Sequence, residues 1–171
     1  MGAQRRTLGG IVNAVAAQAA QPVMVIKTAS ELDRPLGRRL LIATGGSPWS
    51  DVAVEHALQR AQALQLALCV LHVEAGPSQP GDTGRPSAES PLLASVTTRA
   101  EALGITCEGR LASGDIAEAI LTTAANTPCR ALVLGSRGVI GWSRPRLGTI
   151  VNAVAARTAL PVLMVKHFVS A

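Results

Sequence analysis

Residues 144–166 read RPRLGTIVNAVAARTALPVLMVK, and residues 5–27 read RRTLGGIVNAVAAQAAQPVMVIK, so the same helix-like and strand-like stretch occurs twice. The two copies align without a gap and share the core Ile-Val-Asn-Ala-Val-Ala-Ala. An internal repeat marks where a structural unit ends. We therefore expect one complete unit over residues 37–171, preceded by residues 1–36, a second copy of the unit's last helix and strand followed by a linker.

Between the two copies and through the second one, apolar runs typical of strands alternate with segments whose apolar residues recur at helical spacing. The expected strands are 39–44, 66–73, 105–111, 131–134 and 162–165, and the expected helices are 50–64, 92–103, 115–125 and 148–158. Ser50 is a plausible N-cap, and residues 74–90 are rich in Gly, Pro and Ser and predict a loop. This order predicts an α/β fold with an open, parallel, five-stranded sheet covered by helices on both faces, a Rossmann-like arrangement.

Composition narrows the range of partners. The net charge is +5, but there is no dense run of Lys and Arg, and aromatic residues make up 2% of the chain, so a nucleic-acid partner is not expected. No apolar run is long enough to predict a membrane span, and the repeat favours a folded N-terminal segment over a signal peptide. The three cysteines lack metal-ligand spacing and are expected to be buried thiols; we expect no metal ligands and a cytoplasmic location.

The loop expected after the fourth strand has the spacing Gly-x2-Gly-x9-Gly-Thr, formed by Gly135, Gly138, Gly148 and Thr149. Glycines let backbone N–H groups approach a phosphate, and residues 148–150 begin a helix whose dipole favours an anion. Arg137, Arg144 and Arg146 add positive charge. From the residues alone, a phosphate site and a connection shaped by turn geometry are about equally supported.

This spacing, together with IATGGSPWSDVAVEHAL (42–58), VLHV (70–73), SGDIAEAI (113–120) and ALVLGSRG (131–138), resembles the nucleotide-binding branch of the universal stress protein family over residues 39–166. The resemblance implies an ATP site, with Mg²⁺ as an optional companion. Ala43 and Thr44 would hold the adenine, Val73 would pack on it, and Leu134 and Gly135 would lie against base and ribose. The phosphates would be cradled by Gly138, Gly148, Thr149 and Ile150.

The chain departs from the family pattern at one position. The first strand of family members usually ends in an acidic residue, where this chain has Gly45, so weaker ATP binding is expected. A dimeric stress-response scaffold that binds no nucleotide is the alternative. An ATP-pyrophosphatase loop is disfavoured because Pro48 and Trp49 replace its Asp and Ser. No residue pattern predicts a catalytic group, so hydrolysis should at most be slow.

The resemblance also implies an assembly. Family members pair through their last strands, antiparallel across a two-fold axis. We therefore expect either a homo-oligomer formed through residues 162–165, or pairing of Pro22–Lys27 with that strand inside one chain. The sequence leaves both open.

Overall fold

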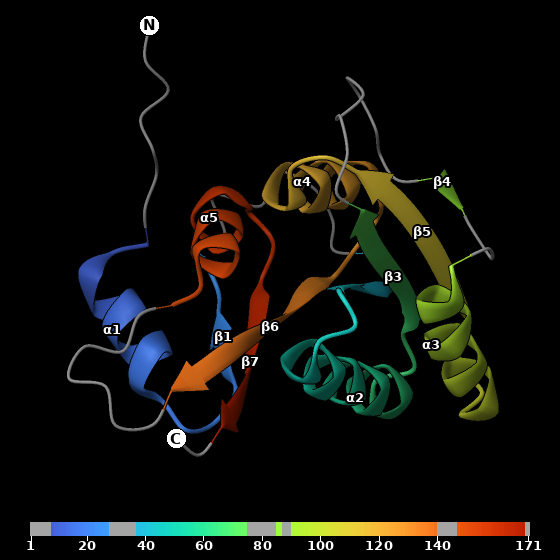
Figure 1. Cartoon of the computed structure of the whole chain (residues 1–171), viewed down its shortest axis with the longest axis horizontal. Helices are drawn as coiled ribbons and strands as arrows, with labels where there is room; N and C mark the ends of the chain where they lie inside the picture. The colour runs from blue at the N-terminus through green and yellow to red at the C-terminus, as the bar shows by residue number, and fades with distance from the viewer. Residues whose placement is uncertain (1–7, 28–36, 75–84, 87–89, 140–146, 170–171) are drawn as a thin grey trace, which may run out of the picture.

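The computed structural model describes residues 8–27, 37–74, 85–86, 90–139 and 147–169 (Figure 1). Strands β2 (Arg39–Ala43), β3 (Ala67–Glu74), β5 (Cys107–Ser113), β6 (Ala131–Val139) and β7 (Val162–Val169) pair in parallel. The predicted α/β fold with a parallel five-stranded centre is confirmed. Within the described residues, the sheet has seven strands in the order β1-β7-β6-β2-β3-β5-β4, because an antiparallel strand is added at each edge.

The two added strands come from segments with different sequence signals. The first, β1 (Val23–Val25), belongs to the first copy of the repeat and pairs with β7, which confirms the expected intrachain pairing. The second, β4 (Arg85–Pro86), pairs with β5 and lies inside the segment predicted as a loop. A strand of two residues is too short to show the residue pattern by which strands are recognised in a sequence.

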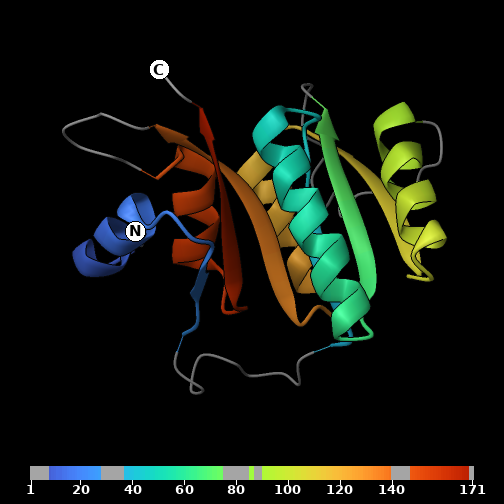
Figure 2. The same cartoon turned by 90° about the horizontal axis from the view of Figure 1, so that it is seen from below.

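Helices cover both faces of the sheet (Figures 1 and 2). On one face, α2 (Pro48–Ala63) and α3 (Pro91–Ala102) bury residues such as Val54, Leu58 and Leu93 against β2, β3 and β6. On the other lie α4 (Ile116–Asn126), α5 (Thr149–Arg157) and α1 (Gly10–Gln18). The strands are apolar at successive positions because both faces are covered, as expected for a parallel sheet.

Several predicted boundaries are wrong: β5 spans Cys107–Ser113 rather than 105–111, and β7 runs to Val169 rather than to 165. Helix α2 begins at Pro48, and its N-cap is Ser47 rather than Ser50. The Ser50 backbone N–H donates to the Ser47 side chain and the Ser47 N–H donates to Ser50 Oγ (2.9 Å), so Ser50 completes a capping box at the third helical position. In addition, residues 135–139 continue strand β6 instead of starting a loop.

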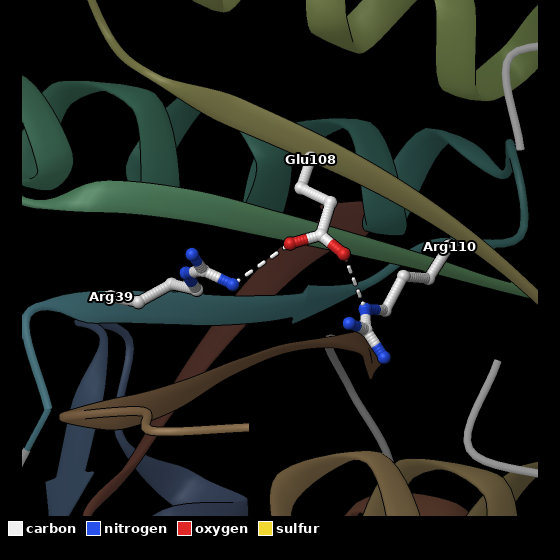
Figure 3. A network of polar contacts seen from close by, with 3 residues as sticks. All are labelled: Arg39, Glu108 and Arg110. Atoms are coloured by element: carbon white, nitrogen blue, oxygen red, sulfur yellow. Dashed lines mark hydrogen bonds and ion pairs between the residues drawn. The ribbon is translucent and has the colours of Figure 1, made fainter. Parts of the chain in front are cut away.

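A charged cluster ties β2 to β5 across β3 (Figure 3). The Glu108 carboxylate accepts from Arg39 Nη1 and from Arg110 Nε, both at 2.8 Å, and the three side chains are partly buried. One carboxylate thus satisfies two guanidinium groups, which would otherwise repel each other on the same face of the sheet.

The thiols are part of the core, as expected. Cys69 and Cys129 are buried and Cys107 is half-buried. Burial raises the pKa of the Cys69 thiol to about 12, which keeps it protonated and unreactive at neutral pH. In the described part of the chain, no helix combines the length and the apolar character that crossing a membrane requires.

Candidate functional site

A pocket of about 220 Å³ opens at the carboxyl ends of β2 and β3 and beside Leu134 and Gly135 in the middle of β6, next to the first turns of α2, α4 and α5. This is the point at which the chain order reverses in the sheet, with β3 on one side of β2 and β6 on the other. Ligands of open parallel sheets bind at such switch points. Its lining consists of Ala43, Thr44, Gly45, Ser47, Trp49, Ser50, Leu71, Val73, Ile116, Ile120, Leu134, Gly135, Ile150 and Val151.

Hydrogen bonds hold the end of β2 in place. The Thr44 N–H donates to the Leu71 carbonyl oxygen (2.9 Å), and Thr44 Oγ1 accepts from the Gly46 N–H (3.3 Å). His72 Nδ1 lies 3.0 Å from the Thr44 carbonyl oxygen. The Thr44 backbone is therefore already engaged, and its carbonyl oxygen keeps one further lone pair for a ligand.

The three helix N-termini at the pocket differ in how they are capped. Ser47 caps α2, and the Asp115 side chain accepts from the Glu118 N–H (2.9 Å) at the start of α4. The N-cap of α5 is Gly148, which has no side chain with which to accept a hydrogen bond. The first N–H groups of α5, including those of Thr149 and Ile150, are therefore available to an anion, and the helix dipole favours one there.

Two glycines of the motif have different surroundings. A Cβ atom at Gly135 would lie 2.5 Å from the Trp49 carbonyl oxygen, so this glycine lets the start of α2 lie directly on β6. A Cβ atom at Gly148 would meet its nearest neighbour, Ser136 Oγ, at 3.9 Å. Gly135 is thus required by packing, whereas the described residues leave space for a side chain at Gly148.

Six of the nine predicted site residues line the pocket: Ala43, Thr44, Val73, Leu134, Gly135 and Ile150. Gly148 and Thr149 stand at the start of α5, next to Ile150. Gly138 lies in the extension of β6, where it pairs with Phe168 of β7. Trp142, Arg144 and Arg146 fall outside the described residues.

Sequence reasoning missed part of the lining. Ser47 and Trp49, at the start of α2, and Ile116 and Ile120, on the first turns of α4, form part of the walls. The other lining residues that were not predicted are Gly45, Ser50, Leu71 and Val151. Ser47 and Trp49 could have been predicted from the sequence, because they directly follow β2, the strand at the switch point. The contribution of α4 depends on how that helix crosses the sheet, which no local pattern records.

The described lining carries no charged side chain, so apolar walls and three hydroxyl groups define it. Beside it, the Arg157 guanidinium of α5 donates to Glu118 Oε2 of α4 (3.0 Å). This hydrogen bond holds the pKa of the Glu118 carboxyl below its usual value. The exposed pair joins the first turn of α4 to the last turn of α5.

A sequence profile described as the universal stress protein family matches residues 37–166. Universal stress protein YxiE of Bacillus subtilis (strain 168) is 28% identical over 145 residues, covering 75% of this chain and 98% of that protein. A universal stress protein from Archaeoglobus fulgidus DSM 4304 has a similar fold (TM-score 0.62, 21% identity, 85% of this chain). This chain spans 50% of that protein's length.

Two similar structures contain nucleotides. One is a universal stress protein in complex with cAMP (TM-score 0.55, 25% identity), in a match that covers 77% of this chain and 98% of that one. The other is a universal stress protein family protein from Arabidopsis thaliana with AMP bound (TM-score 0.56, 20% identity, 78% of this chain and 92% of that one). Since the family profile spans most of the sequence, the chain belongs to the universal stress protein family.

Proposed function

We propose that the pocket between β2 and β6 binds an adenine nucleotide, with ATP as the first candidate, and that the protein acts as a cytoplasmic stress-response regulator rather than as an enzyme. The observation that carries this proposal is the pairing of a mainly apolar pocket with the uncapped N-terminus of α5. The apolar part suits a base and ribose, and the helix start suits phosphate. The cAMP and AMP complexes of similar proteins support the same class of ligand.

The residues around the pocket support binding more than catalysis. Phosphoryl transfer needs a group that orients the attacking nucleophile and a cation held near the phosphates. No carboxylate or histidine is among the described lining residues, and Gly45 stands where a carboxylate would help to hold Mg²⁺. We therefore expect ATP hydrolysis to be slow at most, and Mg²⁺ to bind through the nucleotide's own phosphates.

The second candidate is a scaffold that binds no nucleotide, and the same Gly45 favours it. Isothermal titration of the full chain with ATP, AMP and cAMP, with and without Mg²⁺, separates the two candidates. Saturable binding of any of these nucleotides below millimolar concentration supports the proposed site, and no binding of any of them at millimolar concentration supports the scaffold.

Gly148→Asp tests where the phosphates bind. Aspartate is a favourable N-cap and meets no steric obstacle at this position, so the fold should be kept while a negative charge is placed against the phosphates. We expect ATP affinity to fall by at least about tenfold, the equivalent of 1.4 kcal/mol. Gly148→Ser is the matched neutral control and should retain binding; equal affinities of the two variants would place the phosphates elsewhere.

A further inference from the structure

A second hollow lies toward the opposite end of the sheet from the pocket between β2 and β6. It is a groove of about 650 Å³, which we call the β1–α2 groove, and its walls include Leu40, Ala131 and Pro161. These residues lie at the starts of β2 and β6 and directly before β7, whereas the first pocket opens at the carboxyl ends of β2 and β3. The two linings share no described residue, so the groove is a separate site.

The groove is open because no described helix lies over β1 on the face that α2 covers (Figure 2). Met24 of β1 pairs with Leu163 of β7, but Leu163 is 9% exposed while Met24 is 46% exposed. Ile26 is 69% exposed, and Leu64, at the C-cap of α2, is 59% exposed on the other side of the groove. Open apolar surface in a concave site is typical of ligand-binding grooves.

Two arginines add positive charge to this apolar lining. Arg60 lies in the last turn of α2 and Arg130 directly precedes β6, and both residues are exposed. The described part of the lining contains no Asp or Glu, and no described carboxylate forms an ion pair with either guanidinium group. Gln21 carries the one other polar side chain of the described lining. The groove thus offers charge for one anionic group and apolar surface for the rest of a ligand.

The two lysines beside this edge of the sheet are directed elsewhere. Lys27 follows Ile26, but its Nζ donates to the Ala156 carbonyl oxygen (3.0 Å) in the last turn of α5, on the opposite face of the sheet. Lys166 Nζ donates to the Ala19 carbonyl oxygen (2.8 Å) at the C-cap of α1. The cations of the groove are therefore guanidinium groups, whose parallel N–H donors fit the two oxygens of a carboxylate.

We propose that the β1–α2 groove binds a fatty acid, whose carboxylate pairs with Arg60 and Arg130 and whose hydrocarbon chain covers Met24 and Ile26. A volume of about 650 Å³ falls within the range of roughly 300–1,000 Å³ for small-molecule sites, which are mostly apolar with a few polar groups that orient the ligand. Covering the exposed apolar side chains supplies affinity, and the unbranched Met24 side chain adapts to the shape of the ligand.

Other classes of ligand fit the described lining less well. A nucleotide or an extended peptide presents many polar groups, and each one that is buried without a hydrogen-bond partner costs free energy. The strands below the groove offer apolar side chains, such as those of Leu40, Ala131 and Val133. A hydrocarbon chain has no polar group to satisfy, and its single carboxylate matches the charge of the two arginines.

The first experiment is isothermal titration of the full chain with decanoate, in the absence of nucleotide. Decan-1-ol is the matched ligand, because it has the same chain length without the charge. We expect saturable one-to-one binding of decanoate below millimolar concentration and at least about tenfold weaker binding of decan-1-ol, since hydrogen bonds to a charged group are the stronger ones. The absence of saturable decanoate binding, or equal affinities for the two ligands, would overturn the proposal.

Substitutions locate the site. Arg60→Gln combined with Arg130→Gln should weaken decanoate binding by at least about tenfold and leave the affinity for decan-1-ol unchanged. Arg38→Gln is the matched control, because Arg38 is exposed and lies outside the groove. Ile26→Glu should also weaken decanoate binding, since its carboxylate would repel that of the ligand at an exposed position that tolerates a polar side chain. Equal decanoate affinities of the double variant and Arg38→Gln would contradict the role of the two arginines.

Competition separates this site from the proposed nucleotide site. Decanoate affinity should be the same with and without millimolar ATP, and the same in Gly148→Asp as in the unaltered chain, because the two linings share no described residue. The titration without nucleotide gives its answer whether or not ATP binds. Displacement of decanoate by ATP would place the fatty acid in the other pocket and overturn the proposal.

Two further measurements identify other occupants of the groove. Glu31 and Asp33 lie outside the described residues. Decanoate binding to Glu31→Gln combined with Asp33→Asn, but not to the unaltered chain, would show that the chain's own acidic residues occupy the groove. Binding of the unaltered chain to phosphatidylglycerol vesicles, but not to decanoate, would assign the arginines to a membrane surface. Either result would overturn the fatty-acid site.

Discussion

Gly135 and Gly148 share one motif but have different physical roles. The N-terminal turn of α2 lies so close to Gly135 that a Cβ atom would be 2.5 Å from a backbone oxygen, while the nearest atom to a Cβ at Gly148 is 3.9 Å away. The spacing Gly-x2-Gly-x9-Gly-Thr therefore combines a packing requirement with a proposed binding requirement. A sequence pattern cannot separate the two, because both select the absence of a side chain.

At Gly45 the absence of a side chain has no packing reason. Apart from the chain neighbours of Gly45, no described residue has an atom within 4 Å of the position that a Cβ would occupy, and Gly46, not Gly45, has the positive φ of +70°. We expect Gly45→Asp to fold normally and to bind ATP with Mg²⁺ about tenfold more tightly, since a hydrogen bond to a charged group contributes about 1.5–3 kcal/mol. Isothermal titration measures this gain.

The neutral variant Gly45→Asn has the same shape and serves as the control. Without Mg²⁺ the advantage of aspartate should shrink, because its charge then faces the phosphates directly. Identical ATP affinities for Gly45→Asp and Gly45→Asn in the presence of Mg²⁺ would contradict the role assigned to the missing carboxylate.

At the scale of elements, tertiary neighbours decided where several helices and strands begin and end. Strand β6 runs on to Val139 because β7 continues beside it, up to the pair Val139 and Val169. The glycines at 135 and 138 predict a loop locally, but hydrogen bonds to a neighbouring strand override that preference. Helix α2 begins at Pro48 because Ser47 and Ser50 cap each other, and proline at the first helical position has no N–H to satisfy.

The cluster of Arg39, Glu108 and Arg110 links two strands that are not neighbours in the sheet (Figure 3). Glu108→Gln removes the negative charge that pairs with the guanidinium groups of Arg39 and Arg110. We expect the free energy of unfolding in urea to fall by about 1–2 kcal/mol, more than for an exposed pair, because the three side chains are partly buried.

Glu55 provides the matched control. It pairs with Arg99 between α2 and α3, and both side chains are more exposed than those of the Glu108 cluster. Glu55→Gln should cost less than about 0.5 kcal/mol, within the range for surface pairs. Equal losses for Glu108→Gln and Glu55→Gln would show that the cluster adds no stability beyond that of an ordinary surface pair.

At the scale of the whole molecule, the pocket is separate from the edge of the sheet where β1 pairs with β7. The pocket lining contains no residue of α1 or β1, although α5 contributes to both places: Ile150 and Val151 line the pocket, and Ala155 and Ala156 lie in the cluster with Ala16. The two regions should therefore respond independently to substitution.

We accordingly expect deletion of residues 1–30 to change ATP affinity by no more than about twofold, the range within which effects at separate sites add. Titration of the truncated and full chains with ATP, each at a concentration where its oligomeric state is known, measures this. A tenfold change would mean that α5 transmits the state of the sheet edge to the pocket. Such a result would link assembly to nucleotide binding.

Much of the fold was predictable from the chain. Alternating strand and helix patterns predicted the parallel centre of the sheet, and the resemblance led to six residues that do line one pocket, from Ala43 to Ile150. The fold prediction is confirmed because apolar periodicity is a local property, while the binding role of the six residues stays a prediction. The placement of Gly138 in β6, the walls supplied by α4 and the edge strand β4 were not predictable, since each depends on a neighbour distant in sequence.

By itself, the sequence determined that the last helix and strand occur twice and that Lys27 and Lys166 are equivalent. Only the tertiary structure decided that the two copies meet, with Met24 opposite Leu163 and each lysine at the other copy's helix end. The physical reason is that a repeat specifies matching surfaces but not contact between them. The open edge of β7 supplies the unpaired backbone groups that bring the copies together.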